Sequence, residues 1–275
     1  MLIICRHQLI KIPWLHPQYY YPASLGEVLN DRYQLATKIG YGSSSTVWLA
    51  RDLHHCRWLK ERYVAIKINA KDHHSRKGAP ESEFAILRYI SRSSRHEGWH
   101  FVRKLIDSFL INNVSGNHIC LVFEPLWLYC RRFVDGVMPS DVLNVILRIV
   151  LEGLDYLHWE CQVIHTDLKP HNVMVKLEDP GILERDVRDE YDHPLPRKIL
   201  DGRTIYLSRN NYGQLFKPTG IIQFTDFGLS VRGNIPHSGC IQAELYRTPE
   251  VVRDAGYTYS ADIWSLGVMV KNMRI

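Results

Sequence analysis

An aspartate, a lysine and an asparagine (Asp167, Lys169 and Asn172) lie within six consecutive residues of this 275-residue chain. They supply three groups that phosphoryl transfer requires: an acceptor for a hydroxyl proton, a cation for the transferring phosphate and an amide oxygen for a metal ion. The simpler interpretation is a polar loop with a helix-capping aspartate, because short matches also arise by chance. The phosphoryl-transfer hypothesis therefore requires a phosphate-binding element and a metal-binding carboxylate elsewhere in the chain.

A carboxylate suited to a metal follows a predicted strand at residues 221–225. Asp226 comes directly after this strand, and Gly228 permits a turn there. The tripeptide 226–228 is common by itself, but here it comes after a loop that ends in Asn172. We therefore predict that Asn172 and Asp226 bind a metal together.

A hairpin over residues 33–50 is the candidate phosphate-binding element. Its predicted strands, 33–40 and 46–50, are joined by a tip rich in glycine and serine. Backbone N–H groups at such a tip can approach a polyphosphate closely, since Gly40 and Gly42 have no Cβ atom. A tight turn is the alternative for two glycines at this spacing. A dinucleotide-binding fingerprint is disfavoured, because a strand and not a helix follows the glycines.

The predicted strand over residues 63–68 carries one lysine in an apolar context, Lys67. This lysine is either solvated at the end of the strand or reaches the phosphates that the preceding hairpin covers. Residues 81–90 have the apolar spacing of a helix. Glu83 in that helix is the candidate to pair with Lys67 and hold its ammonium group, and Glu81 is the alternative.

A hinge is predicted at residues 124–126, after a pair of strands at 101–110 and 118–123. Pro125 lacks a backbone donor and should end the second strand. In such a hinge, the backbone at Glu124 and Leu126 would face the edge of a purine.

Two apolar helices are predicted further along the chain. The first covers residues 140–158, has Ser140 as its N-cap and is apolar on nearly all sides, which indicates a buried helix. The second covers residues 259–270 and carries Asp262 near its start. This carboxylate either caps its own helix or braces the amides of a neighbouring loop.

The composition excludes several other classes of protein. The chain is 45% hydrophobic and 23% charged, as in ordinary globular proteins. Its net charge of +5 is spread out, without basic blocks interleaved with aromatic residues, which disfavours direct nucleic-acid binding. Six scattered cysteines without a Cys-x-x-Cys pair indicate a reducing compartment. Arg6, His7 and Lys11 interrupt the apolar start, and we expect neither a signal peptide nor a membrane span.

Two segments stand apart from the predicted elements. Residues 1–32 are rich in aromatic residues and proline, and we predict an irregular extension that lies on the domain. Residues 178–217 are polar with a local excess of acidic side chains, and we interpret them as an insertion. This insertion is either a solvated acidic loop or a docking surface for basic substrate segments.

Taken together and in this order, these segments resemble the eukaryotic protein kinase family over residues 33–275. The resemblance implies an α+β fold with two lobes: a small antiparallel-sheet N-lobe at about 33–123 and a mainly helical C-lobe at 127–275. It also implies that the family fold continues for several helices beyond Ile275. One of those helices would supply an arginine partner for Glu250, so we expect a C-lobe that is incomplete at its C-terminal end, exposes apolar surface and has low stability.

The resemblance assigns roles to individual residues. ATP and Mg²⁺ are the cofactors it implies, with ATP bound between the lobes. Asp167 and Lys169 would be catalytic, and Asn172 and Asp226 would hold Mg²⁺. The implied nucleotide-binding residues are Ile39, Gly40, Tyr41, Gly42, Ser43, Ser44, Ser45, Val47, Ala65, Lys67, Glu83, Glu124 and Leu126.

Finer details resemble the SR-protein kinases, which are Ser/Thr kinases. These details are Thr166 between His165 and Asp167, Ser45 in place of a third glycine, and the segments 21–33 and 259–264. The resemblance implies a monomeric kinase that acts on Arg/Ser-rich proteins in mRNA processing, in the cytoplasm, the nucleus or both. Thr166 replaces an arginine that in many kinases binds an activation-loop phosphate, so we expect activity without loop phosphorylation.

Two other functions compete with this one. The first is a catalytically weak, truncated kinase-like module that binds nucleotide or another protein. The second is a small-molecule phosphotransferase, which is disfavoured because Thr248-Pro249-Glu250 and the Asp262/Trp264 pair would not be expected there.

Overall fold

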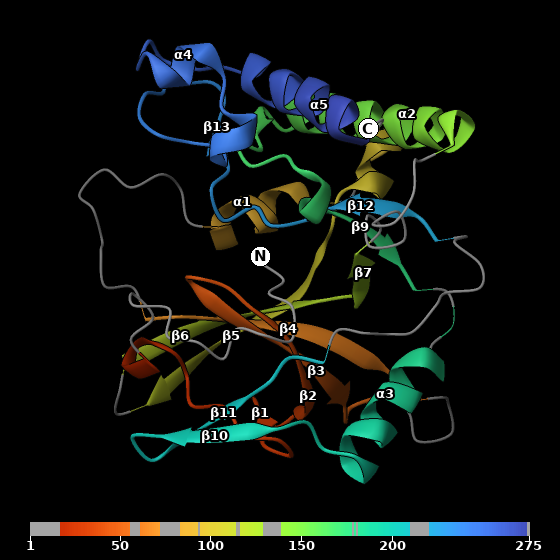
Figure 1. Ribbon diagram of the computed structural model, residues 1–275, viewed down its shortest axis with the longest axis vertical. Helices are drawn as coiled ribbons and strands as arrows, with labels where there is room; N and C mark the ends of the chain where they lie inside the picture. The colour runs from red at the N-terminus through yellow and green to blue at the C-terminus, as the bar shows by residue number, and fades with distance from the viewer. Residues whose placement is uncertain are drawn as a thin grey trace. The chain divides into compact units, whose positions relative to one another are not determined.

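The computed structural model describes residues 17–55, 61–71, 83–92, 94–113, 116–128, 139–177, 179, 181–209 and 220–273 (Figure 1). Contacts divide the chain into two compact units. The sheet unit comprises Met1–Ser75, Leu105–Pro125 and Leu177–Pro218. The helical unit comprises Arg76–Lys104, Leu126–Lys176 and Thr219–Ile275. Neither unit is a single contiguous piece of chain, and each is described by itself.

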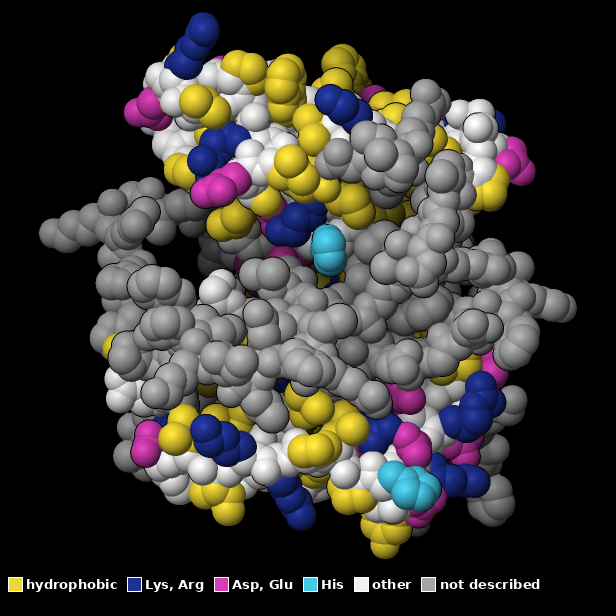
Figure 2. All heavy atoms as spheres, in the orientation of Figure 1, with side chains coloured by type: hydrophobic (Ala, Val, Ile, Leu, Met, Phe, Trp, Pro, Cys, Tyr) yellow, Lys and Arg dark blue, Asp and Glu magenta, His cyan; other side chains and the backbone are white. Residues whose placement is uncertain are grey.

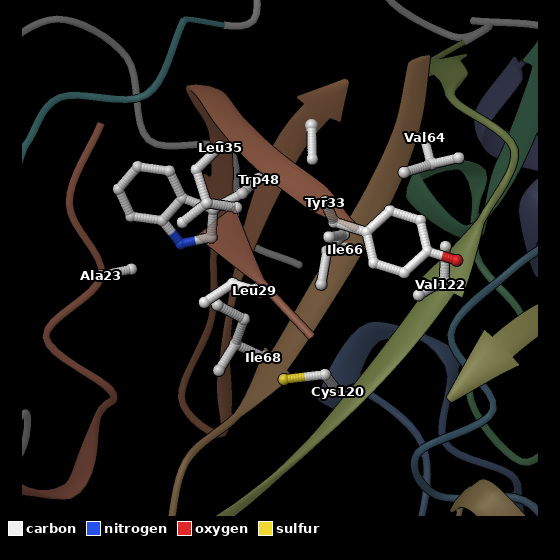
Figure 3. Close-up of a cluster of buried hydrophobic side chains, with 11 residues drawn as sticks. Ala23, Leu29, Tyr33, Leu35, Trp48, Val64, Ile66, Ile68, Cys120 and Val122 are labelled. Atoms are coloured by element: carbon white, nitrogen blue, oxygen red, sulfur yellow. The ribbon is translucent and has the colours of Figure 1, made fainter. Parts of the chain in front are cut away.

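The sheet unit is built on a six-stranded antiparallel sheet with strand order β1-β2-β3-β4-β6-β5. The strands are β1 (Val28–Leu29), β2 (Tyr33–Tyr41), β3 (Ser45–Asp52), β4 (Tyr63–Asn69), β5 (Leu105–Asn113) and β6 (Gly116–Phe123). Side chains that alternate along β2 and its neighbours meet in one hydrophobic cluster (Figure 3). Leu35, Trp48 and Ile66 belong to it, and each is at most 3% exposed. Burial of these large side chains is the main source of stability in this unit.

The segment before β2 is more regular than predicted. Val28–Leu29 pairs antiparallel with the start of β2, so the expectation of an irregular segment over residues 1–32 is corrected there. Ala23 and Leu29 are 3% and 4% exposed and belong to the same cluster as β2. A short 3₁₀ turn, Pro17–Tyr19, precedes them. In its described part the extension packs on the domain as expected, and residues 1–16 lie outside the described residues.

The predicted insertion contains regular structure and belongs to the sheet unit. It forms α3 (Gly181–Asp192) and a hairpin of β10 (Arg197–Leu200) and β11 (Arg203–Tyr206). Leu183 of α3 is 5% exposed and packs with Leu49 and Tyr63 of the sheet. The Tyr206 ring lies edge-on to Trp48, with centroids 5.6 Å apart. The segment is therefore not the solvated loop considered from its composition.

The acidic side chains of α3 are largely paired with arginines. Arg209 contacts both Asp189 and Glu190, and its Nε lies 2.8 Å from Glu190 Oε2. Arg188 lies 3.5 Å from Glu184, one helical turn away. Figure 2 shows acidic and basic side chains intermixed over this helix. This pairing leaves less net charge for the basic-substrate docking surface that the local acidity suggested.

The helical unit contains α1 (Glu83–Ile90), α2 (Ser140–Asp155), α4 (Pro249–Val252) and α5 (Ser260–Met273). Short strands join them: β7 (Leu126–Leu128), β8 (Val163–Ile164), β9 (Val173–Lys176), β12 (Ile222–Phe224) and β13 (Val231–Arg232). β9 lies between β12 and β7, and β13 pairs with β8. The shorter turns are Glu97–Phe101, Tyr156–Glu160, Pro170–Asn172 and Glu244–Tyr246. No helix of the described residues is long and apolar enough to cross a bilayer.

Helix α2 differs from its prediction in two respects. Pro139 is the N-cap residue and forms no side-chain cap, while Ser140 is the first helical residue. The buried residues Leu143, Ile146, Val150 and Leu154 share one face. Val145 on the opposite side is 59% exposed, so the helix is not buried all round.

Candidate active site

The loop between β8 and β9 contains Asp167, Lys169 and Asn172, and its start is fixed by a carboxylate from α5. His165 and Thr166 are completely buried. Their backbone N–H groups donate to Asp262 Oδ2 and Oδ1 over 2.8 and 2.9 Å. Asp262 is itself 0% exposed, and His158 Nε2 lies 2.8 Å from its Oδ2. Of the two roles predicted for Asp262, the structure supports the bracing of a neighbouring loop.

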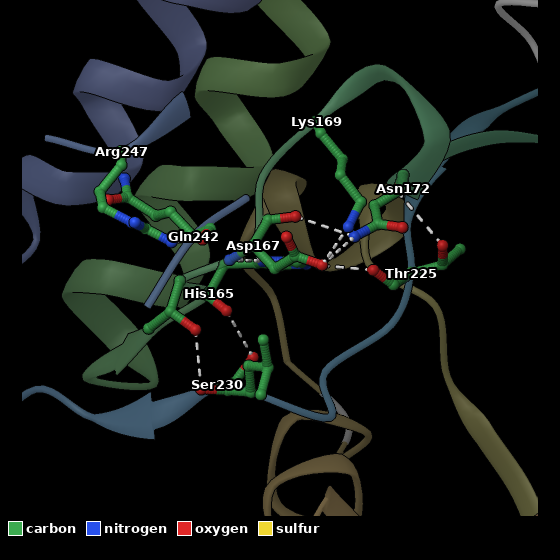
Figure 4. Close-up of polar contacts among 10 residues, drawn as sticks. His165, Asp167, Lys169, Asn172, Thr225, Ser230, Gln242 and Arg247 are labelled. Atoms are coloured by element: carbon green, nitrogen blue, oxygen red, sulfur yellow. Dashed lines mark hydrogen bonds and ion pairs between the residues drawn. The ribbon is translucent and has the colours of Figure 1, made fainter. Parts of the chain in front are cut away.

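The side chains of Lys169 and Asn172 both bond one carboxylate oxygen of Asp167 (Figure 4). Lys169 Nζ donates to Asp167 Oδ2 over 2.5 Å, and Asn172 Nδ2 donates to the same oxygen over 3.1 Å. Asn172 Nδ2 also donates to the Asp167 carbonyl over 2.8 Å. These bonds hold the Asp167 carboxylate by Oδ2, and no bond to its Oδ1 comes from the described residues. The arrangement suits an acceptor for a hydroxyl proton.

Asn172 presents an oxygen that suits a cation. Because its amide nitrogen is used by Asp167, its Oδ1 points elsewhere. This atom is buried and has no hydrogen-bond partner among the residues that the structure describes. An unsatisfied buried oxygen is costly unless a ligand completes it. Asp226 lies next to Thr225, whose N–H donates to the Asn172 carbonyl over 2.9 Å. Amide and carboxylate oxygens are ligands of Mg²⁺, so this donor set fits that ion.

The chain after Asp226 is bonded to the start of the same loop. Thr166 Oγ1 donates to the Leu229 carbonyl over 2.7 Å, and Ser230 Oγ donates to the His165 carbonyl over 3.0 Å. Thr166 and Asp226 both have φ of 66°, which non-glycine residues seldom adopt. The hydrogen bonds between these two segments therefore join two stretches of chain that each contain a residue in an uncommon backbone conformation.

A glutamine that the sequence did not single out anchors the chain further on. Gln242 is 6% exposed and has φ of 63°. Its Nε2 donates to the Ala261 carbonyl over 2.9 Å and to Ser265 Oγ over 2.8 Å, and its Oε1 accepts from Thr248 N over 3.0 Å. It thus connects the start of α4 to α5. Neither its residue type nor its spacing signals this role.

In the sheet unit, strand register brings together many of the predicted nucleotide-binding residues. Val47 is the register partner of both Gly40 and Lys67, on opposite sides of β3. Ala65 pairs with Phe123 of β6. The tip of the β2–β3 hairpin (residues 42–44) is closed by a 2.8 Å bond from Gly42 N to the Ser45 carbonyl. The other predicted nucleotide-binding residues of this hairpin are Ile39, Tyr41, Ser43, Ser44 and Ser45.

Glu83 belongs to the helical unit and lies near Asp226. A Cβ atom built on Gly228 would lie 3.8 Å from Glu83 Oε2 and 3.6 Å from Asp226 Oδ1. Its pairing with Lys67 of the sheet unit stays a prediction, and Glu81 lies outside the described residues. Glu124 and Pro125 lie between β6 and β7, and Leu126 is the first residue of β7. The hinge at residues 124–126 and its contacts with a purine stay predictions.

Comparison with known proteins places this site in a family. The family described as protein kinase domain matches residues 33–275. A serine/threonine protein kinase of Aspergillus fumigatus is 35% identical over 266 residues, which cover 94% of this chain and 62% of the relative. A serine/threonine-protein kinase SRPK of Physarum polycephalum is 32% identical over 273 residues, covering 91% of this chain and 62% of the relative. SRSF protein kinase 3 of Mus musculus is 35% identical over 170 residues, covering 59% of this chain and 29% of the relative.

The crystal structure of a kinase domain shares the fold, with a TM-score of 0.65 at 24% identity, covering 93% of this chain and 67% of that one. The chain spans 62% of the length of its Aspergillus and Physarum relatives. The bilobal α+β fold inferred from the sequence is confirmed. With the family matched over residues 33–275, the chain belongs to the protein kinase domain family.

Proposed function

We propose that this protein is an ATP-dependent serine/threonine protein kinase. The observation that carries the proposal is the Asp167 carboxylate, which Lys169 and Asn172 hold by Oδ2 alone. A serine hydroxyl could approach the other oxygen, which would orient it and finally accept its proton. Lys169 would then steady the γ-phosphate during transfer. Most of the rate would come from positioning and charge stabilisation.

Several groups of the chain would bind the nucleotide phosphates. Asn172 Oδ1 and the Asp226 carboxylate are the oxygens that would hold Mg²⁺, a cation that bridges phosphates and neutralises their charge. In the sheet unit, the backbone N–H groups of the β2–β3 tip and the Lys67 ammonium would bind the phosphates. Backbone groups at Glu124 and Leu126 would bind the adenine edge.

For the acceptor we propose a serine in an Arg/Ser-rich segment, and a role in mRNA processing in the cytoplasm, the nucleus or both. Relatives named SRPK and SRSF protein kinase support this class of substrate. Thr166, in place of the usual arginine, supports it too. We propose that the protein acts as a monomer.

The test is phosphate transfer from radiolabelled ATP to an Arg/Ser peptide, with Asp167→Asn as the matched variant. The substitution keeps the size of the side chain but removes the proton acceptor, so the rate should fall about 10²- to 10⁴-fold. ATP binding, measured in parallel, should remain. Asp192→Ala, at an exposed position near the end of α3, controls for loss of a carboxylate elsewhere.

Two further peptides test the proposed specificity. Replacing arginine by lysine in the peptide should lower the rate, while replacing serine by alanine should abolish incorporation. Equal incorporation by wild type and Asp167→Asn would contradict intrinsic kinase activity and favour the nucleotide-binding module instead.

A further inference from the structure

A tyrosine from the N-terminal extension reaches the tip of the β2–β3 hairpin. Tyr20 Oη lies 3.0 Å from the Gly42 carbonyl oxygen and 2.7 Å from the Ser43 carbonyl oxygen. A phenol has one O–H, so the two carbonyls share one donor. Burial raises the pKa of Tyr20 above its ordinary value of 10.0, so the hydroxyl keeps its proton at neutral pH.

Holding these two carbonyls also sets the direction of two N–H groups. In a trans peptide the C=O and the following N–H point to opposite sides, and the described residues contain no cis peptide bond. With the carbonyls of Gly42 and Ser43 turned toward Tyr20, the N–H groups of Ser43 and Ser44 point away from it. Successive N–H groups that face one side form a concave anion-binding surface. Tyr20 therefore orients the donors that a phosphate-covering hairpin needs.

Tyr20 is in turn held by the inserted segment. Arg203 Nη1, from β11, donates to the Tyr20 carbonyl over 2.9 Å. The residue before it is also held, because Lys71 N donates to the Tyr19 carbonyl over 2.8 Å. Arg203 therefore helps to fix Tyr20, although the two residues are 183 positions apart in the sequence.

The hairpin that carries Arg203 is fixed to the same two strands whose tip Tyr20 holds. Lys38 Nζ of β2 donates to the Tyr206 carbonyl over 3.2 Å, and Arg209 N donates to the Lys38 carbonyl over 2.7 Å. On β3, Trp48 packs against the Tyr206 ring. All of these residues belong to the sheet unit, where β10 and β11 accompany β1 and β2 (Figure 1).

We propose that Tyr20 and Arg203 are positioning residues that hold the hairpin tip ready for the phosphates of a nucleoside triphosphate. This inference rests on the proposed nucleotide-binding function. Through them the inserted segment sets nucleotide affinity without touching the nucleotide. Loss of either contact lets the tip peptides rotate, and apparent affinity falls with the fraction of molecules that remain competent.

The test compares Mg²⁺-ATP with adenosine by isothermal titration of the full chain carrying Tyr20→Phe. Loss of one hydroxyl should weaken ATP binding roughly three- to ten-fold. Adenosine has no phosphates, so its affinity should not change. Arg203→Ala, on β11, should likewise weaken ATP binding and leave adenosine binding unchanged. The double variant should bind ATP about as tightly as the weaker of the two single variants. Tyr191→Phe, at a side chain that is 87% exposed, is the matched control and should bind both ligands normally.

Unchanged ATP affinity in both Tyr20→Phe and Arg203→Ala would overturn the inference. Equal weakening of ATP and adenosine would overturn it too, because that pattern indicates a general loss of structure. Arg203→Lys, which keeps a donor, should recover part of the ATP affinity. Wild-type protein that binds neither ligand would instead overturn the proposed function, and the positioning role with it.

Discussion

Thr166 stands where many kinases have an arginine, and it joins the loop of residues 165–172 to the chain after Asp226. Its side chain is fully buried, its backbone has φ of 66°, and its hydroxyl bonds the Leu229 carbonyl directly. An arginine at this buried position would bring a positive charge, which is costly to bury without an anion beside it. A threonine needs only a carbonyl, which the chain after Asp226 supplies.

We expect Thr166→Val to be harmful and Thr166→Ser to be nearly neutral. Valine keeps the shape but removes the donor, leaving the Leu229 carbonyl without its bond, and should lower stability by about 1–2 kcal/mol. It should also lower kcat several-fold, because the segment that carries Asp226 loses a contact. Serine keeps the hydroxyl, so its activity should stay within about two-fold of wild type.

The measurements for this pair are thermal melts and kcat on the same peptide. Equal values for the valine and serine variants would show that the hydroxyl contributes nothing. A loss in stability without a loss in kcat would limit Thr166 to a structural role.

At this scale, the sequence indicated the side chains that perform chemistry better than those that position them. Asp167, Lys169 and Asn172 were predicted together because their types and spacing suit one reaction, and the structure brings them to one oxygen. Tyr20 and Gln242 could not be predicted in the same way. Their roles depend on backbone carbonyls and amides brought near them by distant parts of the chain.

At the scale of elements, the loop of residues 165–172 and the chain after Asp226 behave as one hydrogen-bonded junction. His165 Nε2 lies 3.1 Å from the Thr225 carbonyl, and its ring lies 5.0 Å from that of Phe227. Asp262 fixes the loop from the other side. All of these bonds join backbone and side-chain groups of the chain itself.

Activity should therefore not depend on phosphorylation of the segment between Asp226 and Glu250. We expect phosphatase treatment to change the rate of peptide phosphorylation less than about two-fold. The residue before Asp167 is Thr166, which cannot pair with a phosphate as an arginine could. Mass spectrometry should verify that phosphate has been removed. A large loss of rate after complete removal would contradict this expectation.

Helices and strands were predicted well where the apolar periodicity of the sequence is strong. They were predicted poorly where contacts with distant parts of the chain determine the local structure. β2, β4 and α5 lie where alternation or helical spacing placed them. The strand predicted from residue 101 begins only at Leu105, because the 3₁₀ turn Glu97–Phe101 precedes it. Helix α3 was missed because its charged residues mask the contacts of Leu183 and Val187 with the sheet unit.

At the scale of the whole molecule, a buried lysine joins the insertion to the sheet. Lys38 is 9% exposed, donates to the Tyr206 carbonyl and lies over the Tyr41 ring. Burial lowers its pKa from 10.5 to about 8. The folded protein therefore binds fewer protons here than the unfolded chain between about pH 8 and 10.5, and stability from this group rises with pH over that window.

Lys38→Met should remove this dependence. Below pH 8 the variant avoids burying a charge, which offsets the lost bond to Tyr206; its stability relative to wild type should be highest there and should decline as pH rises toward 10.5. Chemical denaturation between pH 6.5 and 10.5 measures the difference. Lys198→Met, at an exposed position on β10, should show no such trend. A constant difference between Lys38→Met and wild type across this range would contradict the shift.

The insertion also has a consequence for the order of events during synthesis. All six strands of the main sheet have been made once Phe123 has been added, but Leu183 and Tyr206, which cover Leu49 and Trp48, come much later. At about 5–20 residues per second, the ribosome leaves these two apolar side chains, one on each face of the sheet, without that cover for several seconds. During this interval the nascent chain offers a surface to chaperones that the finished protein conceals.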